Sequence, residues 1–143
     1  MNHWLALAVA AVFIWLGMVM AISLLEAPLK FRAPGVTIKI GLGIGRLVFR
    51  ALNMCEVVLA AVALVAVVFG RPSTGALVAL GLAVAALGAQ VVGVRPALTR
   101  RSDAVLADAS AAASGRSHAH VVYIGFEAVK VVALLICGVL LLA

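Results

Sequence analysis

Apolar residues fall into four long runs along the chain, and most polar residues lie between these runs. The runs cover about Trp4 to Leu25, Gly41 to Phe69, Thr74 to Val94, and His120 to Leu142. A helix needs about 20 residues to cross the roughly 30 Å hydrocarbon core of a bilayer, and each run is long enough. The pattern therefore predicts an all-α, four-transmembrane-helix bundle, with residues 1–143 forming a single integral membrane domain.

The composition agrees with a membrane protein and changes the interpretation of the net charge. The chain is 66% hydrophobic and 11% charged, whereas soluble domains are roughly half apolar and a quarter charged. The net charge is +6 and the isoelectric point is about 10.4. Because the basic residues lie in connections or inside apolar runs, they do not form the solvated patch of a nucleic-acid-binding protein. We expect the lipid bilayer and its anionic headgroups as partners, and no nucleic acid.

The connections between the runs predict the orientation in the membrane. The first, Ala27 to Ile40, contains two prolines and is expected to be irregular. The second, Gly70 to Ser73, is a tight turn, and the third, Arg95 to Ala119, is the longest. Lys and Arg number three in the first connection, one in the turn and four in the third, with none at either terminus. By the positive-inside rule both termini lie on the outer side, and we expect a bacterial inner (plasma) membrane.

Polar residues occur within or at the ends of the apolar runs, where ionised groups are costly and mark functional or structural cores. Two of the runs carry stripes at helical spacing, with Arg46, Arg50 and Asn53 at i, i+4 and i+7 in the second run. A similar stripe in the fourth run predicts that these two helices face each other. The predicted intramembrane polar core consists of Glu26, Arg46, Arg50, Asn53, Glu56, Tyr123, Glu127 and Lys130.

The levels of these residues along the helices predict three ion pairs. Counted at about 1.5 Å per residue from the predicted cytoplasmic ends, acids and bases fall at matching depths. The predicted pairs are Glu26 with Arg46, Arg50 with Glu127, and Glu56 with Lys130. These pairs leave the core without net charge.

A charged core in a membrane bundle has two interpretations. In the first, it binds a small polar or anionic solute or relays protons, and because four helices are too thin for a wide pore, transport needs a homo-oligomer or a larger partner. In the second, the charges fix which helices are neighbours, and the protein is a non-catalytic accessory subunit of a larger membrane complex. The sequence contains no recognised catalytic signature, so an enzyme is not the favoured class, and the residues do not identify a cofactor.

Histidine and cysteine residues suggest little metal or redox chemistry. His118 and His120, together with Glu26 or Glu127, are the candidate metal ligands, although a structural site needs about four well-placed ligands. Cys55 and Cys137 both lie inside apolar runs with no CxxC spacing, so we expect small packing residues rather than a disulfide.

Several segments resemble a known family. Leu16 to Thr37 (LGMVMAISLLEAPLKFRAPGVT), Gln90 with Val94 to Arg101 (VRPALTRR), and Ser117 to Glu127 (SHAHVVYIGFE) are similar to the transmembrane protein 205 family of small four-helix proteins. The resemblance implies a four-span bundle with a long cytoplasmic connection. The chain departs from the family in its shorter connection and in Glu127 with Lys130, which replace a mostly apolar stretch.

A shorter segment, Arg50 to Glu56 (RALNMCE), is similar to the membrane-associated eicosanoid and glutathione metabolism family. That resemblance implies that Arg50, Asn53 and Glu56 help to bind glutathione. The chain lacks one residue between the arginine and the asparagine, and it has no counterpart of the family's third-helix arginine and tyrosine pattern. A glutathione-dependent membrane enzyme is therefore the runner-up enzyme hypothesis.

Overall fold

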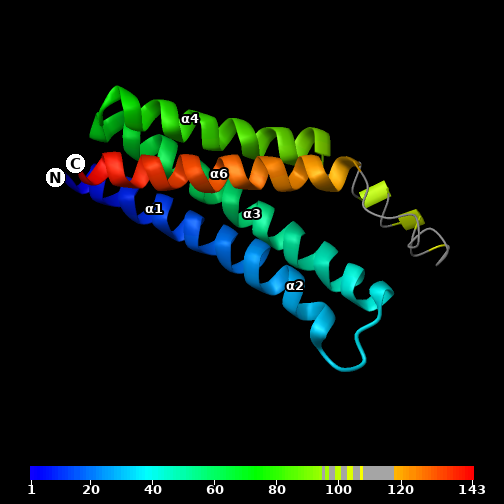
Figure 1. Cartoon of the computed structure of the whole chain (residues 1–143). Helices are drawn as coiled ribbons and strands as arrows, with labels where there is room; N and C mark the ends of the chain where they lie inside the picture. Colours follow the sequence, from blue (N-terminus) through cyan, green and yellow to red (C-terminus); the bar gives the residue numbers. More distant parts are fainter. Residues whose placement is uncertain (95, 97–98, 101–102, 105–106, 108–117) are drawn as a thin grey trace.

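The computed structural model describes residues 1–94, 96, 99–100, 103–104, 107 and 118–143, with only the backbone at 94 and 118–120. Within these residues the chain is helical and contains no strand (Figure 1). Four helical segments are long and apolar enough to cross a membrane, as predicted: His3–Arg32, Ile38–Gly70, Thr74–Gly93 and Val121–Leu142. These spans make the protein an integral membrane protein.

The first span continues beyond the predicted end at Leu25. It consists of α1 (His3–Met20), a π-helical segment η1 (Ala21–Glu26), the short helix α2 (Ala27–Leu29) and a 3₁₀ turn, Lys30–Arg32. Proline lacks an N–H and clashes with the preceding turn of an α-helix, so Pro28 argued for a break. The wider π segment before it, in which the Ala27 N–H bonds to the Ile22 carbonyl, accommodates the proline.

The irregular part of the first connection is consequently shorter than the predicted Ala27 to Ile40. It begins at Ala33, and Gly35 adopts a φ of 81°, which is available to glycine without strain. The second span, α3 (Ile38–Gly70), begins where the Thr37 side chain accepts a hydrogen bond from the Ile40 N–H at 3.2 Å.

The predicted tight turn between the second and third spans is present. α3 ends at Gly70, and Arg71 closes it in the left-handed conformation, with a φ of 51°. Ser73 caps the next helix, α4 (Thr74–Ala89), by accepting a hydrogen bond from the Ala76 N–H at 3.4 Å. α4 continues as a second π-helical segment, η3 (Gln90–Val94), and the last span is α6 (His118–Leu142).

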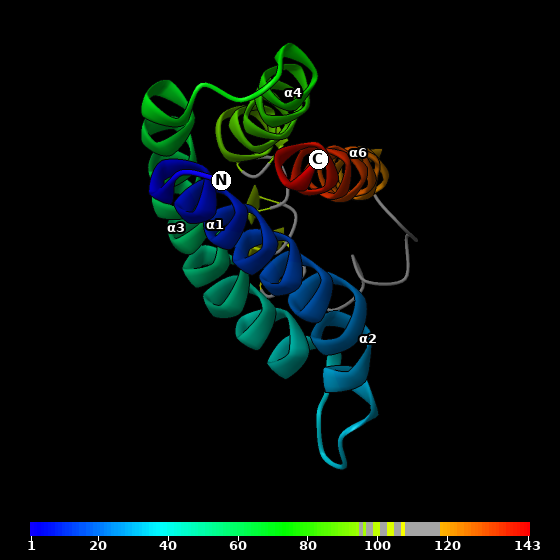
Figure 2. The ribbon, with the colours of Figure 1, turned by 90° about the vertical axis from the view of Figure 1, so that its left-hand side faces the viewer.

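The four spans form two antiparallel pairs, α1 with α3 and α4 with α6. α1 also packs against α6, so that α3 and α6 lie diagonally across the bundle instead of facing each other as predicted (Figure 2). Both termini and the α3–α4 turn lie at one end, which we call the terminal end (Figure 1). From there the two pairs diverge toward the opposite end.

The apolar core occupies the half of the bundle near the terminal end. Alanines allow close packing there: Ala8, Ala63, Ala76 and Ala83 are completely buried. The core also contains Val12, Leu80, Leu134 and Cys137. Cys137 is buried as predicted, whereas Cys55 is exposed on the outer face of α3, and neither forms a disulfide. The divergent half contributes no residue to this core cluster.

Candidate functional site

A cluster of polar side chains lies where the apolar core ends and the helix pairs begin to diverge. It draws on all four spans and is called the central cluster below. Counted from the terminal end, Lys130 lies 12 residues from Leu142 and Gln90 lies 16 residues from Thr74. At 1.5 Å per residue these separations are about 18 Å and about 24 Å, which place the cluster between the midplane of a hydrocarbon core of about 30 Å and its boundary away from the terminal end. The members of the central cluster are Trp15, Ser23, Glu56, Gln90, Glu127 and Lys130.

The Lys130 ammonium is the centre of this cluster. Its Nζ lies 2.6 Å from Glu56 Oε1, 2.6 Å from Glu127 Oε1 and 2.7 Å from Gln90 Oε1. A lysine ammonium has three N–H donors, and three acceptors from three different spans are present. The lysine on α6 therefore crosses the centre of the bundle to reach Glu56 on the diagonal helix α3.

The two carboxylates receive further hydrogen bonds. Gln90 Nε2 donates to Glu127 Oε1 at 2.8 Å and to the Tyr123 carbonyl at 3.3 Å. Ser23 Oγ donates to Glu127 Oε2 at 2.6 Å, and Trp15 Nε1 donates to Glu56 Oε1 at 2.9 Å. Both oxygens of Glu127 accept hydrogen bonds, as expected for an ionised carboxylate in a polar network.

Burial is uneven across the cluster. Trp15, Glu56, Gln90 and Lys130 are 0% exposed, whereas Glu127 is 7% exposed. Ser23, which donates to Glu127, is partly exposed. The least buried part of the cluster is therefore the edge formed by Ser23 and Glu127.

Among the described side chains, the central cluster combines two acids with one base. Glu56 and Glu127 supply two carboxylates, and Lys130 supplies one ammonium, so these three groups together carry −1 when all are ionised. A buried charge without a counter-charge is costly in a low-dielectric interior. Electrostatics in the cluster thus favours one additional positive charge and disfavours an anion.

Both π-helical segments contribute to this site. Ser23 lies within η1, and Gln90 is the first residue of η3. Single π turns inside α-helices rotate side chains away from the regular register and recur at functional sites. Two such turns in different spans place their polar side chains on the same carboxylate, Glu127.

Of the three predicted ion pairs, the structure contains Glu56 with Lys130. The other two are absent. Glu26 Oε2 lies 3.6 Å from Lys30 Nζ on the same span, and Arg46 Nη1 lies 2.7 Å from Asp103 Oδ1. Glu127 pairs with Lys130, one turn further along its own helix, and not with Arg50.

The remaining predicted core residues divide between inside and outside. Asn53 and Tyr123 are buried, and the Tyr123 ring packs edge-on against Phe49 with centroids 5.8 Å apart. Arg50 is exposed, although it shares a predicted stripe with Asn53. The inward face of α3 is rotated from that stripe, because it is set by Leu52, Asn53, Glu56 and Ala60.

Trp15, Ser23 and Gln90 belong to the cluster but were not among the predicted core residues. Gln90 carried a usable signal, since it is the only carboxamide in the apolar run from Thr74 to Val94. An uncharged polar group inside a membrane span requires a hydrogen-bond partner. Trp15 carried no comparable signal, because nothing in the sequence pairs its indole N–H with a buried carboxylate.

The described residues include only part of the predicted metal-ligand set, Glu26 and Glu127. No group of three or more His, Cys, Asp or Glu side chains suited to a metal ion occurs in the part of the chain that the structure describes. The backbone of His118 and His120 opens α6, and their side chains lie outside the described residues.

Comparisons with known proteins add no relative. No family model matches the chain, and no curated protein and no solved structure matches it significantly.

Proposed function

We propose that the protein handles a small cation, the proton, at the central cluster of a membrane bundle that works as a homo-oligomer. The observation that carries this proposal is that two buried carboxylates, Glu56 and Glu127, share the ammonium of Lys130. An anionic solute would increase the negative charge. A proton restores neutrality and needs no cavity, which suits the tight packing around Lys130.

In this conformation the cluster is accessible from one end, and passage of a proton across the membrane requires a second conformation that opens the cluster toward the terminal end. Toward the terminal end, the cluster is closed by packed residues such as Val12, Ala63 and Leu134, each 0% exposed. On the other side, the Ser23 hydroxyl contacts Glu127 and is partly exposed. A hydroxyl both donates and accepts. Ser23 can give its proton to Glu127 Oε2 while its oxygen takes another from the accessible side, so the proton count of the hydroxyl is unchanged.

The orientation follows from the basic residues. The connections that hold three and four Lys and Arg residues are assigned to the cytoplasm, and both termini are assigned to the outer side. In this orientation Ser23 and Glu127 open toward the cytoplasmic side. The protein then belongs to a bacterial inner membrane and exchanges protons with the cytoplasm.

The two family resemblances bear on this proposal to different degrees. The resemblance to the transmembrane protein 205 family agrees with four spans, but it adds no chemistry. Glutathione binding would use Arg50, Asn53 and Glu56 together. Arg50 is exposed, whereas Glu56 is buried and bonded to Lys130 and Trp15, so these three residues do not converge on one accessible site.

Reconstituted vesicles test the proposal. Purified protein in liposomes containing a pH-sensitive dye is subjected to a pH step, and proton uptake is compared for the wild type and Glu127→Gln. The matched control is Glu26→Gln, the same exchange in a carboxyl that the structure places outside the cluster, beside Lys30. We expect wild type and Glu26→Gln to take up protons and Glu127→Gln to lose at least tenfold in rate.

Equal uptake by wild type and Glu127→Gln would refute the proposal. The competing role as an accessory subunit predicts a different result. In that case the wild type shows no uptake above empty liposomes, and native mass spectrometry of gently extracted protein shows a defined complex with other subunits instead of a homo-oligomer.

A further inference from the structure

Arg50 lies on the outward, apolar stripe of α3. Three exposed apolar residues lie on the same side of the helix within about two turns of Arg50: Leu47 (72% exposed), Met54 (66%) and Val57 (51%). Arg50 itself is exposed and makes no ion pair with an acid among the described residues. A membrane helix that presents such a stripe to the outside faces lipid.

A guanidinium on a lipid-facing stripe needs an anionic partner or water. Arg50 lies 20 residues from Gly70 at the terminal end, which corresponds to about 30 Å along the helix. Side chains of a helix lean toward its N-terminus, and for α3 this is the direction away from the terminal end. The Arg50 guanidinium therefore reaches the level at which the hydrocarbon core ends and lipid phosphates begin.

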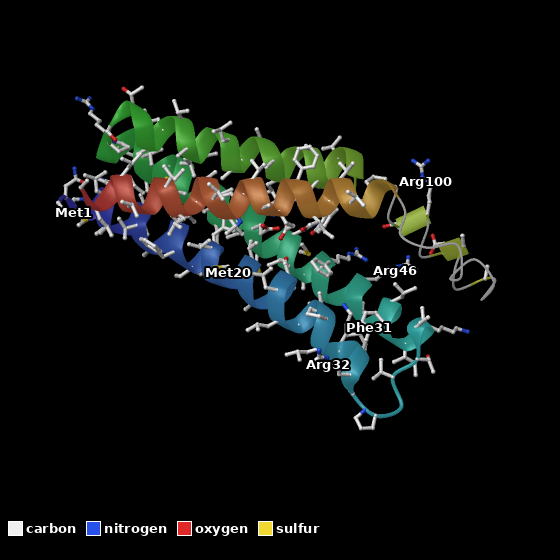
Figure 3. The ribbon with its side chains drawn as sticks, viewed as in Figure 1. Met1, Met20, Phe31, Arg32, Arg46 and Arg100 are labelled. Atoms are coloured by element: carbon white, nitrogen blue, oxygen red, sulfur yellow. The ribbon has the colours of Figure 1, made fainter. Side chains whose placement is uncertain are left out.

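Two further cations lie on the same side of α3. Arg46 lies one turn before Arg50, toward the N-terminus of the helix. Lys39 lies two turns further in the same direction and is exposed. Between them, a Cβ atom added at Gly43 would meet nothing within 4 Å, so the helix surface is open at that point. Arg46 also contacts Asp103, which leaves the three cations and this acid with a net charge of +2. Figure 3 shows Arg46 extending from α3 on the side away from the terminal end.

We propose that this surface, made of Lys39, Gly43, Arg46 and Arg50, binds the headgroup of an anionic phospholipid. Arg50 contacts the phosphate, for which a guanidinium provides two parallel N–H donors. Arg46 and Lys39 add positive charge toward the aqueous side, and the acyl chains run along Met54 and Val57. The apolar continuation of the stripe favours a lipid over a free phosphate, which would leave these side chains without a partner. The proposal is independent of the chemistry of the central cluster.

Lipid titration followed by native mass spectrometry tests the site. Delipidated protein in detergent is titrated with phosphatidylglycerol or phosphatidylcholine, and the bound lipids are counted. We expect the wild type to prefer phosphatidylglycerol and Arg50→Gln to bind it about fivefold more weakly, as for the loss of one cation beside anionic lipid. The control Arg71→Gln removes an exposed arginine at the terminal end and should bind like the wild type.

A second variant keeps the test valid if Arg50→Gln does not fold. Lys39→Gln lies in the exposed first turn of α3 and should reduce phosphatidylglycerol binding about twofold. Equal losses in Arg50→Gln and Arg71→Gln would overturn the proposal, because binding would then reflect net charge alone. Equal binding of both lipids by the wild type would also overturn the proposal. A change from oligomer to monomer in Arg50→Gln would overturn it as well, because a second copy of the chain would then occupy this face.

Discussion

Removal of the buried lysine should destabilise the bundle far more than removal of either buried acid. In a balanced pair, the loss of either partner leaves one uncompensated charge. In the central cluster, by contrast, Lys130→Met leaves the buried carboxylates of Glu56 and Glu127 without the ammonium that they share. Glu56→Gln leaves one acid and one base, whose charges cancel. The two substitutions therefore distinguish a cluster of two acids and one base from a simple ion pair.

The magnitudes follow from the contacts. Lys130→Met removes three short contacts, to Glu56, Glu127 and Gln90, and breaking a buried charge pair costs about 3–5 kcal/mol. Glu56→Gln keeps an oxygen that can accept from the Trp15 indole. It makes the Trp15 bond a neutral one and leaves the Lys130 bond with charge on the donor alone, which costs about 1–2 kcal/mol. The expected difference between the variants is about 1–4 kcal/mol.

The free energy of unfolding can be measured for both variants by titrating SDS into bicelles that contain the purified protein, with helicity or tryptophan fluorescence as the signal. Val129→Met is a suitable control, because it introduces a methionine on the exposed face of the same helix. The reasoning is wrong if Lys130→Met is no more destabilising than Glu56→Gln.

Two further predictions concern packing and the hydrogen bonds of the cluster. Gly41→Ala should lower the melting temperature, because the added Cβ would overlap the Phe31 ring, whereas Gly43→Ala meets open space and should stabilise α3 by up to about 1 kcal/mol. Equal shifts in thermal unfolding for the two alanine variants would contradict this close approach. Gln90→Leu should cost about 2–3 kcal/mol in the same SDS titration, because Glu127 and Lys130 each lose a buried partner. A matched Leu87→Met exchange one turn earlier should cost less than about 1.5 kcal/mol, and a Gln90→Leu variant as stable as that control would exclude the bridging role of Gln90.

The spans and the tight turn could be predicted from the sequence because length and hydropathy alone determine whether a helix can cross a membrane. The first connection could not be predicted in the same way. Pro28 suggested a break, and the π segment that accommodates it leaves no pattern of apolar and polar residues. The first span consequently reaches Arg32, and Lys30 lies on the same helical face as Glu26. That intrahelical partner replaces the predicted pair with Arg46.

The pairing of charges depends on rotation about each helix axis as well as on depth. Matching depths correctly paired Glu56 with Lys130, since both lie on inward faces. Depth could not show that Arg50 is rotated outward while Asn53, three residues later, is buried. Small apolar residues, such as the buried Ala63 and Ala83, allow helices to pack closely, and their position on a helix determines which face is turned inward. The direction of every polar side chain on that helix follows from this rotation.

Stability of the folded bundle does not by itself require the charges of the central cluster. A buried ionic network can often be replaced by apolar residues of similar volume at no cost, even though removing one member is harmful. In this bundle the other half of the interior is already apolar, with Val12, Leu80 and Leu134 fully buried, so an apolar centre is compatible with the fold. The triple variant Glu56→Gln, Glu127→Gln, Lys130→Met removes all three charges together. If it unfolds like the wild type in SDS but takes up no protons in vesicles, the charges serve ion handling; if it unfolds much more easily, they serve to select the neighbouring helices.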